Sequence, residues 1–217
     1  KRYQVPLSKI DVSYNGAHET YRPLGWEERE AVKQQYAEGC EYFVFAGALH
    51  PRKNILNLLK SFILFKKRQR SNMKLVIVGR LAWNYKEIEE MRESMPFRDE
   101  VKWVGYLDVT ELAKVIGGAY ALVYASLFEG FGIPILESLQ CEVPAIVSNT
   151  SSMPEVGGNA ALLVDPLDPE DIAAKMEQLY KDELLRNRLI AAAKTQVQKF
   201  SWDLTAERLW KSMMECV

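Results

Sequence analysis

The sequence FEGFGIPILE, residues 128–137, determines the fold prediction because it places two carboxylates, with seven residues between them, around a glycine-bearing turn. The run before it, YALVY at residues 120–124, is continuously apolar, which is typical of a strand buried on both faces of a parallel sheet. Residues 133–140 have helical character. The sequence therefore predicts that Glu129 lies at the carboxyl end of a buried strand, just before a helix.

The turn itself suits a ligand that carries phosphate. Gly130 and Gly132 let the backbone turn tightly and approach a ligand closely. The amides of Phe131, Gly132 and Ile133, at the start of the helix, offer unpaired donors and the positive end of the helix dipole. The pattern predicts a diphosphate site that needs no catalytic metal.

The decapeptide resembles the two-carboxylate motif of retaining nucleotide-sugar glycosyltransferases of the GT-B architecture, family 4 (glycosyltransferase group 1). This group includes mannosyl- and glucosyltransferases of polysaccharide and lipid-glycan synthesis. The resemblance implies that Glu129 hydrogen-bonds hydroxyls of the donor hexose, whereas Glu137 holds the ribose hydroxyls of the nucleotide. Ionised carboxylates are acceptors, as hydroxyl recognition requires. The simpler alternative is that Glu129 is an acidic loop residue and Glu137 a solvated helix residue. That alternative does not explain two glycines and a proline at these positions.

A second motif, FAGALHPRKN at residues 45–54, follows the strand predicted at 41–46. It is similar to the diphosphate loop of the same family. Arginine can grip a phosphate with two hydrogen bonds and lysine adds a compact charge, so the resemblance implies that Lys53 and Arg52 stabilise the leaving diphosphate beside the Gly47 turn. Many relatives carry arginine where this chain has Ala48, and Arg52 is the candidate replacement. Taken alone, the basic pair would be interpreted as a solvated helix start.

Further segments complete the resemblance. The segment VGYLD at residues 104–108 occupies the family's usual base position, so Tyr106 and Leu107 are base-site candidates. Trp83 and Tyr85 follow the Gly79 turn. One interpretation is that they frame the diphosphate or the edge of the sugar, and the simpler and favoured one is that they pack beneath a loop.

The segment SNTSSMPE at residues 148–155 is similar to a family loop in which structural roles are at least as plausible as chemical ones. We interpret Glu155 as tying this loop rather than catalysing. We interpret His18 as structural and His50 as a lesser loop candidate, because neither has metal-ligand spacing or a nearby nucleophile.

The pattern of apolar runs predicts an α/β fold with a doubly wound parallel sheet. The resemblance implies that this fold is Rossmann-like and forms one half of a GT-B architecture. Ligands are then expected at the carboxyl ends of the strands. Strands are predicted at residues 10–14, 41–46, 74–79, 101–104, 120–124, 144–147 and 161–164. Helices are predicted at residues 26–37, 54–69, 86–94, 109–117, 133–140, 169–180, 183–198 and 203–214.

The 217 residues can bury one good core, and the chain begins with Lys1 rather than methionine. The resemblance implies a single nucleotide-sugar-binding domain over residues 1–217, with closing helices at about 200–217 that return toward an amino-terminal acceptor domain. That acceptor domain is expected to be absent from this chain. We therefore expect the isolated domain to be inactive.

Composition excludes several classes of function. The net charge of -1 argues against a general nucleic-acid binder. Cys40, Cys141 and Cys216 are odd in number and widely spaced, so neither a disulfide framework nor a zinc site is expected. No apolar run reaches the about 18 residues that span a bilayer, and no signal peptide opens the chain. We expect a cytoplasmic protein, with peripheral contact at the inner face of the membrane for the whole protein. An interfacial membrane role for helix 54–69 is the less favoured alternative to a core crossover helix.

The resemblance implies transfer of a hexosyl unit, of mannose or glucose type, from a UDP-, GDP- or ADP-sugar to a hydroxyl of a glycan or lipid-linked acceptor. Retention at the anomeric carbon is expected, without a cofactor or metal, with Lys53 and Arg52 stabilising the diphosphate and Glu129 orienting the sugar. Two alternatives stay open. One is a non-catalytic nucleotide-sugar-binding or regulatory module, and the other is a sugar-nucleotide epimerase of the same architecture, for which no acid and base residues stand out.

Overall fold

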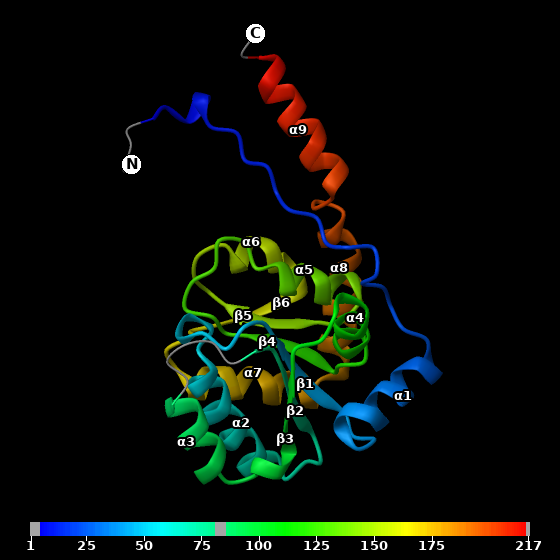
Figure 1. Cartoon of the computed structure of the whole chain (residues 1–217), viewed down its shortest axis with the longest axis vertical. Helices are drawn as coiled ribbons and strands as arrows, with labels where there is room; N and C mark the ends of the chain where they lie inside the picture. Colours follow the sequence, from blue (N-terminus) through cyan, green and yellow to red (C-terminus); the bar gives the residue numbers. More distant parts are fainter. Residues whose placement is uncertain (1–4, 81–85, 216–217) are drawn as a thin grey trace.

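The computed structural model describes residues 5–80 and 86–215. Its six parallel strands form one sheet in the order β3-β2-β1-β4-β5-β6 (Figure 1). The chain order reverses between β1 and β4, which are neighbours at the centre of the sheet, and α/β sheets bind ligands at such a switch point. The strands are β1 (Tyr42–Ala46), β2 (Lys74–Val78), β3 (Val101–Gly105), β4 (Ala121–Tyr124), β5 (Ala145–Ser148) and β6 (Ala161–Val164).

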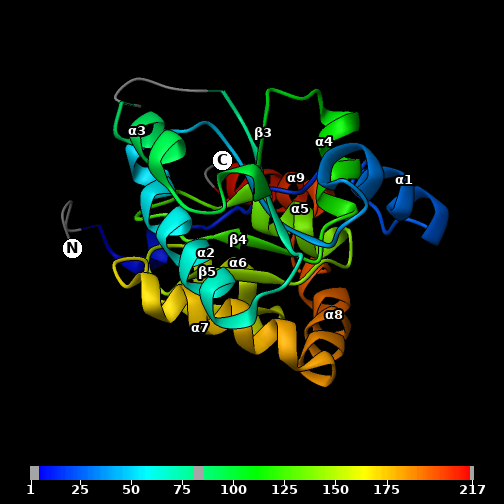
Figure 2. The ribbon, with the colours of Figure 1, turned by 90° about the horizontal axis from the view of Figure 1, so that it is seen from below.

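Helices cover both faces of the sheet, as the predicted doubly wound, Rossmann-like fold requires. On one face α2 packs against α7, and on the other α5 packs against α4 and α8 (Figure 2). The helices formed by the described residues are α1 (Trp26–Ala37), α2 (Ile55–Gln69), α3 (Lys86–Ser94), α4 (Val109–Gly117), α5 (Ile133–Gln140), α6 (Met153–Gly157), α7 (Pro169–Lys181), α8 (Glu183–Val197) and α9 (Trp202–Met214).

The core lies between the sheet and these helices. Every residue of β1, β4 and β5 is buried, because helices cover both faces of a central parallel strand. The helix α2 turns Leu59, Phe62 and Phe65 into this core. The Lys66 ammonium near its end is also buried and donates to the Met73 carbonyl at 3.1 Å. The apolar side of α2 is therefore core surface, as expected for a crossover helix. In the two described ranges no helix is long and apolar enough to cross a membrane.

The helices and strands predicted from residue 26 onward are all present, with each boundary within one residue of its prediction. The short helix α6 was not resolved by the sequence pattern, because five residues carry too little periodicity. The strand predicted at residues 10–14 is wrong.

Residues 10–18 form an extended arm beside α9 instead of a strand (Figure 1). Side chains of α9 take the place of a neighbouring strand: Arg208 donates to the Val12 carbonyl at 3.1 Å, and Ser212 donates to Asp11 at 2.6 Å. Ile10 and Val12 are exposed. The arm therefore follows a helix from the other end of the chain, which local sequence does not reveal.

The turns after β1 and β2 approach each other so closely that residue 79 has to be glycine. Gly79 has φ +151°, and a Cβ added there would lie 1.9 Å from the Gly47 carbonyl oxygen. The Gly47 amide donates to the Val78 carbonyl at 2.9 Å, which joins the two turns. Any side chain at Gly79 must push apart the two strand ends that border the carboxyl edge.

We predict that Gly79→Ala lowers the free energy of unfolding by roughly 3 kcal/mol or more, because strain at this φ adds to a backbone clash. Urea unfolding of the purified chain measures the change. Gly130→Ala is the matched control, since a Cβ at Gly130 meets no atom within 4 Å. Equal unfolding midpoints for the two variants would contradict the prediction.

Candidate functional site

The carboxyl ends of β1 and β4 bring the two predicted motifs together. The Lys53 ammonium donates to Glu129 Oε1 at 2.7 Å and to the Tyr124 hydroxyl. The Tyr124 hydroxyl in turn donates to the same Glu129 oxygen at 3.1 Å. Lys53 and Glu129 are both more than nine-tenths buried. Three polar side chains thus form a closed cluster at the switch point of the sheet.

Arg52 joins this cluster from its exposed side. Its Nη1 donates to Glu129 Oε2 at 2.7 Å and to the Phe128 carbonyl at 3.2 Å. The Arg52 side chain is 46% exposed, so a ligand in solvent can reach the guanidinium. The structure therefore brings together Lys53, Arg52 and Glu129, the candidates that the two motifs supplied.

Burial and ion pairing shift the pKa values of Lys53 and Glu129 in opposite directions. Burial lowers the pKa of Lys53 below its ordinary value, and the Glu129 carboxylate partly offsets this. Burial acts to raise the pKa of Glu129, but hydrogen bonds from Lys53 and Arg52 outweigh it and leave that pKa below its usual value. Burial raises the pKa of Tyr124, so its phenol keeps its proton and can donate. Lys53 and Glu129 form a salt bridge with an N–O distance of 2.7 Å.

Two serines hold the backbone that carries Glu129. The Glu129 amide donates to Ser151 Oγ at 3.2 Å, and Ser152 Oγ donates to the carbonyls of Glu129 at 3.0 Å and Phe131 at 2.8 Å. Glu155, further along this segment, accepts a hydrogen bond from Tyr14. These contacts agree with the interpretation of residues 148–155 as a supporting loop.

The turn before α5 has the geometry expected of a helix start. Gly132 is the N-cap and has φ +100°, which favours glycine. The Phe131 ring packs between Tyr14 and Phe200, at centroid distances of 6.3 and 5.7 Å. Ile133 begins the helix and is partly exposed. Packing fixes the Phe131 side chain, so only backbone amides of the turn remain candidates for binding phosphate.

A pocket of about 440 Å³ lies beyond the ends of β1, β2 and β3. Gly47, Ala48, Arg80, Tyr106 and Leu107 line it. The structure thus places both base-site candidates beside the Gly47 turn. The Arg80 guanidinium lies over the exposed Tyr106 ring, 4.1 Å from its centroid. Arg80 therefore brings a cation to the pocket that Ala48 also lines. The sequence pattern did not indicate this position for Arg80.

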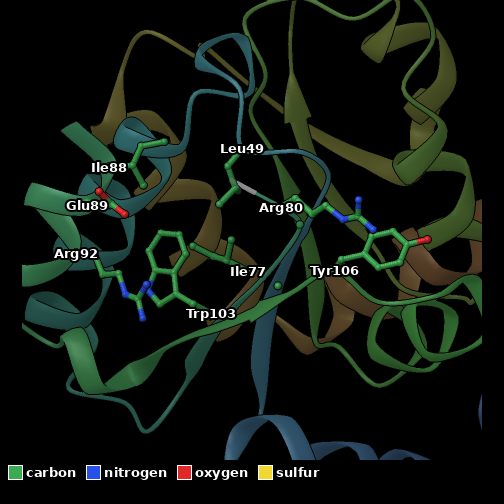
Figure 3. Close-up of a pocket in the computed structure, with 10 residues that line it drawn as sticks. Leu49, Ile77, Arg80, Ile88, Glu89, Arg92, Trp103 and Tyr106 are labelled. Carbon is green, nitrogen blue, oxygen red and sulfur yellow. The ribbon is translucent and has the colours of Figure 1, made fainter. Parts of the chain in front are cut away.

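An adjoining pocket of about 320 Å³ shares Gly79, Arg80 and Tyr106 with the first one, and its lining is drawn in Figure 3. The Trp103 ring from β3 and the Arg92 guanidinium from α3 stack at 5.2 Å along it. Trp83 and Tyr85, the aromatic candidates after the Gly79 turn, lie outside the described residues.

Glu137, the second carboxylate of the motif, has a different environment from Glu129. It lies in α5, and its partner is the hydroxyl of the buried Tyr21. Burial raises the pKa of Glu137, and the Tyr21 hydrogen bond partly offsets this. Cys141 lies nearby, and burial raises the pKa of its thiol to about 12. The two carboxylates are therefore held by separate partners, which allows them to have separate tasks.

The remaining candidates have local roles. His18 is exposed and its Nδ1 accepts from the Thr20 amide at 3.2 Å, as expected of a structural residue. His50 caps the short turn before α2, where its Nδ1 accepts from the Arg52 amide at 3.3 Å. In the described part of the chain, Cys40 and Cys141 are free thiols, and no three His, Cys, Asp or Glu residues gather as a metal site.

Residues 27–196 match the family model of glycosyl transferases group 1. The chain belongs to this family. It is 31% identical over 202 residues to the O-antigen chain mannosyltransferase B of Escherichia coli, a match that covers 93% of this chain and 53% of that protein. This group 1 chain therefore spans about half the length of that relative.

Solved structures agree with the family assignment. The C-terminal domain of a glycosyl transferase group 1 family protein (LpcC) from Francisella tularensis has a TM-score of 0.70 at 20% identity, covering 83% of this chain and 95% of that one. HepE from Anabaena, in complex with UDP and glucose, has a TM-score of 0.82 at 16% identity and covers 94% of this chain and 56% of that one. These likenesses show the fold, the Rossmann-like half of a GT-B architecture.

Tyr124 is a member of the candidate site that the sequence pattern did not indicate. It ends the apolar run that predicts β4, and its ring stacks on Phe45 at 5.9 Å, so it looks like a core residue. The signal available in the sequence was its position, the last residue of a central strand and five residues before Glu129. Its hydroxyl direction comes only from the structure.

We predict that Tyr124→Phe lowers the pKa of Lys53 further, because the buried ammonium loses an acceptor, and lowers the free energy of unfolding by about 1–2 kcal/mol. NMR titration of the Lys53 13Cε resonance and urea unfolding measure the two effects. Tyr42→Phe is the control, since this buried tyrosine of β1 donates to the Val115 carbonyl at 2.6 Å, away from Lys53. An equal Lys53 pKa in the two variants would contradict the contact between Lys53 and the Tyr124 hydroxyl.

Proposed function

We propose that this chain is the donor-binding domain of a retaining glycosyltransferase, which transfers a hexosyl unit from a nucleoside diphosphate sugar to an acceptor hydroxyl. The observation that carries the proposal is the cluster of Lys53, Arg52 and Glu129 beside the Gly47 pocket, in a chain of the group 1 family. Two cations and a carboxylate meet at one strand edge. Such a set can hold a diphosphate and a sugar at the same time.

In the proposed reaction the bond between the anomeric carbon and the diphosphate oxygen breaks, and its electron pair goes to the diphosphate. Lys53 and Arg52 stabilise the charge that develops there, together with the amides that begin α5. The acceptor oxygen bonds to the same face of the anomeric carbon, and its proton passes to a phosphate oxygen. Glu129 accepts hydrogen bonds from sugar hydroxyls and so fixes the orientation of the hexose. No metal or cofactor is assigned a part.

Diphosphate binding must rearrange the cluster. Both cations contact Glu129 in the ligand-free structure, so a donor molecule exchanges some of these contacts for phosphate oxygens and frees Glu129 oxygens for hydroxyls. Tyr124 can keep its bond to Lys53 through this exchange. The pairing in the ligand-free site thus keeps buried charges compensated until the donor arrives.

The other parts of the donor have assigned places. Glu137 accepts from the ribose hydroxyls, and the base lies in the 440 Å³ pocket against Leu107 and Tyr106. Mannose is the favoured sugar, because the Escherichia coli relative is named a mannosyltransferase. The acceptor, a glycan or lipid-linked sugar of polysaccharide synthesis, would bind to a second domain facing this strand edge. We place the reaction in the cytoplasm, at the inner face of the membrane.

Calorimetry tests the proposal. The purified chain is titrated with UDP, GDP and ADP and with their glucose, mannose and N-acetylglucosamine conjugates, first with a chelator and then with a divalent cation. We expect one nucleotide family to bind without metal, and one attached sugar to tighten binding. Binding of none of these ligands, either by this chain or by a longer protein that contains it, would overturn the donor assignment.

We predict that Glu129→Ala abolishes the gain in affinity from the attached sugar but leaves the affinity for the free nucleoside diphosphate within a few-fold. Glu137→Ala should lower the affinity for the free nucleotide by about tenfold, because one or two hydrogen bonds to a charged acceptor are lost. Calorimetry with matched pairs of nucleotide and nucleotide sugar measures both. An equal loss of both ligands in the two variants would contradict this division of roles.

We also predict a pH dependence that originates in Glu137. Because burial raises the pKa of Glu137, the carboxyl protonates at a higher pH than ordinary glutamates do, and the protonated form accepts ribose hydroxyls less well. Nucleotide affinity should therefore fall as the pH is lowered through a window above 4.5. Glu137→Gln is the control, and the difference between its binding profile and that of the wild type removes the titration of the phosphate itself. Parallel profiles would contradict the prediction.

A further inference from the structure

The pocket of about 440 Å³ at the ends of β1, β2 and β3 has walls suited to a flat ring, with a single charge among them. Its volume lies within the range of small-molecule sites, and Val78, Leu107 and Leu112 give it apolar walls. Among the described residues that line it, the polar side-chain groups are the Arg80 guanidinium and the Tyr106 hydroxyl. None of these residues brings a carboxylate. The pocket therefore favours a ligand edge that accepts hydrogen bonds.

The backbone of Arg80 is fixed, while its guanidinium is free to bind. The Arg80 carbonyl accepts from the Leu49 amide at 2.9 Å, which ties the turn after β2 to the turn after β1. The side chain is exposed, and the guanidinium lies over the Tyr106 ring (Figure 3). In the described part of the chain no carboxylate pairs with Arg80, whereas Arg52 is held by Glu129. A ring on one face of a guanidinium leaves the N–H groups at its edge for a ligand.

Arg80 lies on the base side of the proposed donor site rather than on the phosphate side. The proposed phosphate ligands Lys53 and Arg52 follow β1, beside the end of β4. Arg80 follows β2 and Tyr106 follows β3, which continue the sheet away from β4. Burying a diphosphate among leucine and valine side chains would cost more than burying an uncharged base. Arg80 is therefore placed to meet the base.

The bases differ in the edge that they present to a pair of N–H donors. Guanine carries two neighbouring acceptors, O6 and N7, which match the fork of an arginine. Adenine has N7, but in place of O6 it carries an amino group, which is itself a donor. Uracil has one carbonyl on the corresponding edge, as thymine does, so it accepts one hydrogen bond there. A bidentate contact of this kind discriminates between bases by about tenfold or more.

We propose that Arg80 selects the base of the donor, and that the donor is a guanosine diphosphate sugar. Two N–H groups of the guanidinium donate to O6 and N7 of the guanine, while the ring of the base lies against Leu107 and Leu112. This inference rests on the proposed donor-binding function and goes beyond it, because Lys53 and Glu129 are assigned to the diphosphate and the hexose. Arg80 is then the residue that distinguishes a GDP-sugar from a UDP- or ADP-sugar.

Calorimetry of the purified chain with GDP, UDP, ADP and 7-deaza-GDP tests the inference, because these ligands share the diphosphate and differ in the base. We expect GDP to bind about tenfold more tightly than ADP, and more tightly than UDP. In 7-deaza-GDP a C–H group replaces N7, so this ligand should bind about tenfold more weakly than GDP. In Arg80→Ala the preference for GDP over ADP should disappear, and GDP and 7-deaza-GDP should bind equally. Arg80→Lys keeps the charge but lacks the fork, so it should lose most of the preference as well.

Arg92→Ala is the matched control. Arg92 also lies over an aromatic ring, 5.2 Å from the Trp103 centroid, but it lines the adjoining pocket rather than this one. This variant should leave the ratios of the four affinities unchanged.

Three outcomes would overturn the inference while the donor assignment stands. The first is a wild-type chain that binds UDP or ADP as tightly as GDP. The second is an equal loss of all four ligands in Arg80→Ala, because Arg80 would then contact the diphosphate. The third is an Arg80→Ala variant with unchanged affinities. Binding of none of the four ligands, either by this chain or by a longer protein that contains it, would overturn the donor assignment and this inference with it.

Discussion

The Lys53 ammonium is the charge around which the carboxyl edge of the sheet is built. Removed from water, it has to be paired, and its partners are Glu129 and Tyr124 of the β4 side. This pairing joins the turn after β1 to the turn after β4, the two strands between which the chain order reverses. Serines after β5 then fix the Glu129 backbone. The connections after β1, β4 and β5 therefore meet around the Lys53–Glu129 pair.

Much of this arrangement could be predicted because its signals are local. The strands β1, β4 and β5 are short apolar runs, and the amphipathic pattern of α2 distinguishes its core side, so the order of elements follows from the sequence alone. Lys53 and Glu129 became site candidates through the resemblance of their two motifs to one family. Their contact agrees with the rule that parallel strands end at the same edge of a sheet.

The features that were missed depend on partners distant in sequence. Residues 10–14 look like a strand, but their hydrogen-bond partners are side chains of α9, about 200 residues away. Tyr124 looks like core, because nothing local indicates that its hydroxyl meets Lys53. Arg80 is one residue after a recognised glycine turn, yet its position over Tyr106 depends on how β2 and β3 pair. The sequence pattern predicts the type of each element. It does not show which way a side chain points or which distant residues it contacts.

The buried polar groups at the carboxyl edge of the sheet are paired with one another, and this pairing constrains what the edge can bind. At the carboxyl edge Lys53, Tyr124 and Glu129 satisfy one another, so a ligand must replace an ion pair and needs charges as strong as the carboxylate it displaces. A diphosphate meets that requirement and a neutral sugar alone does not.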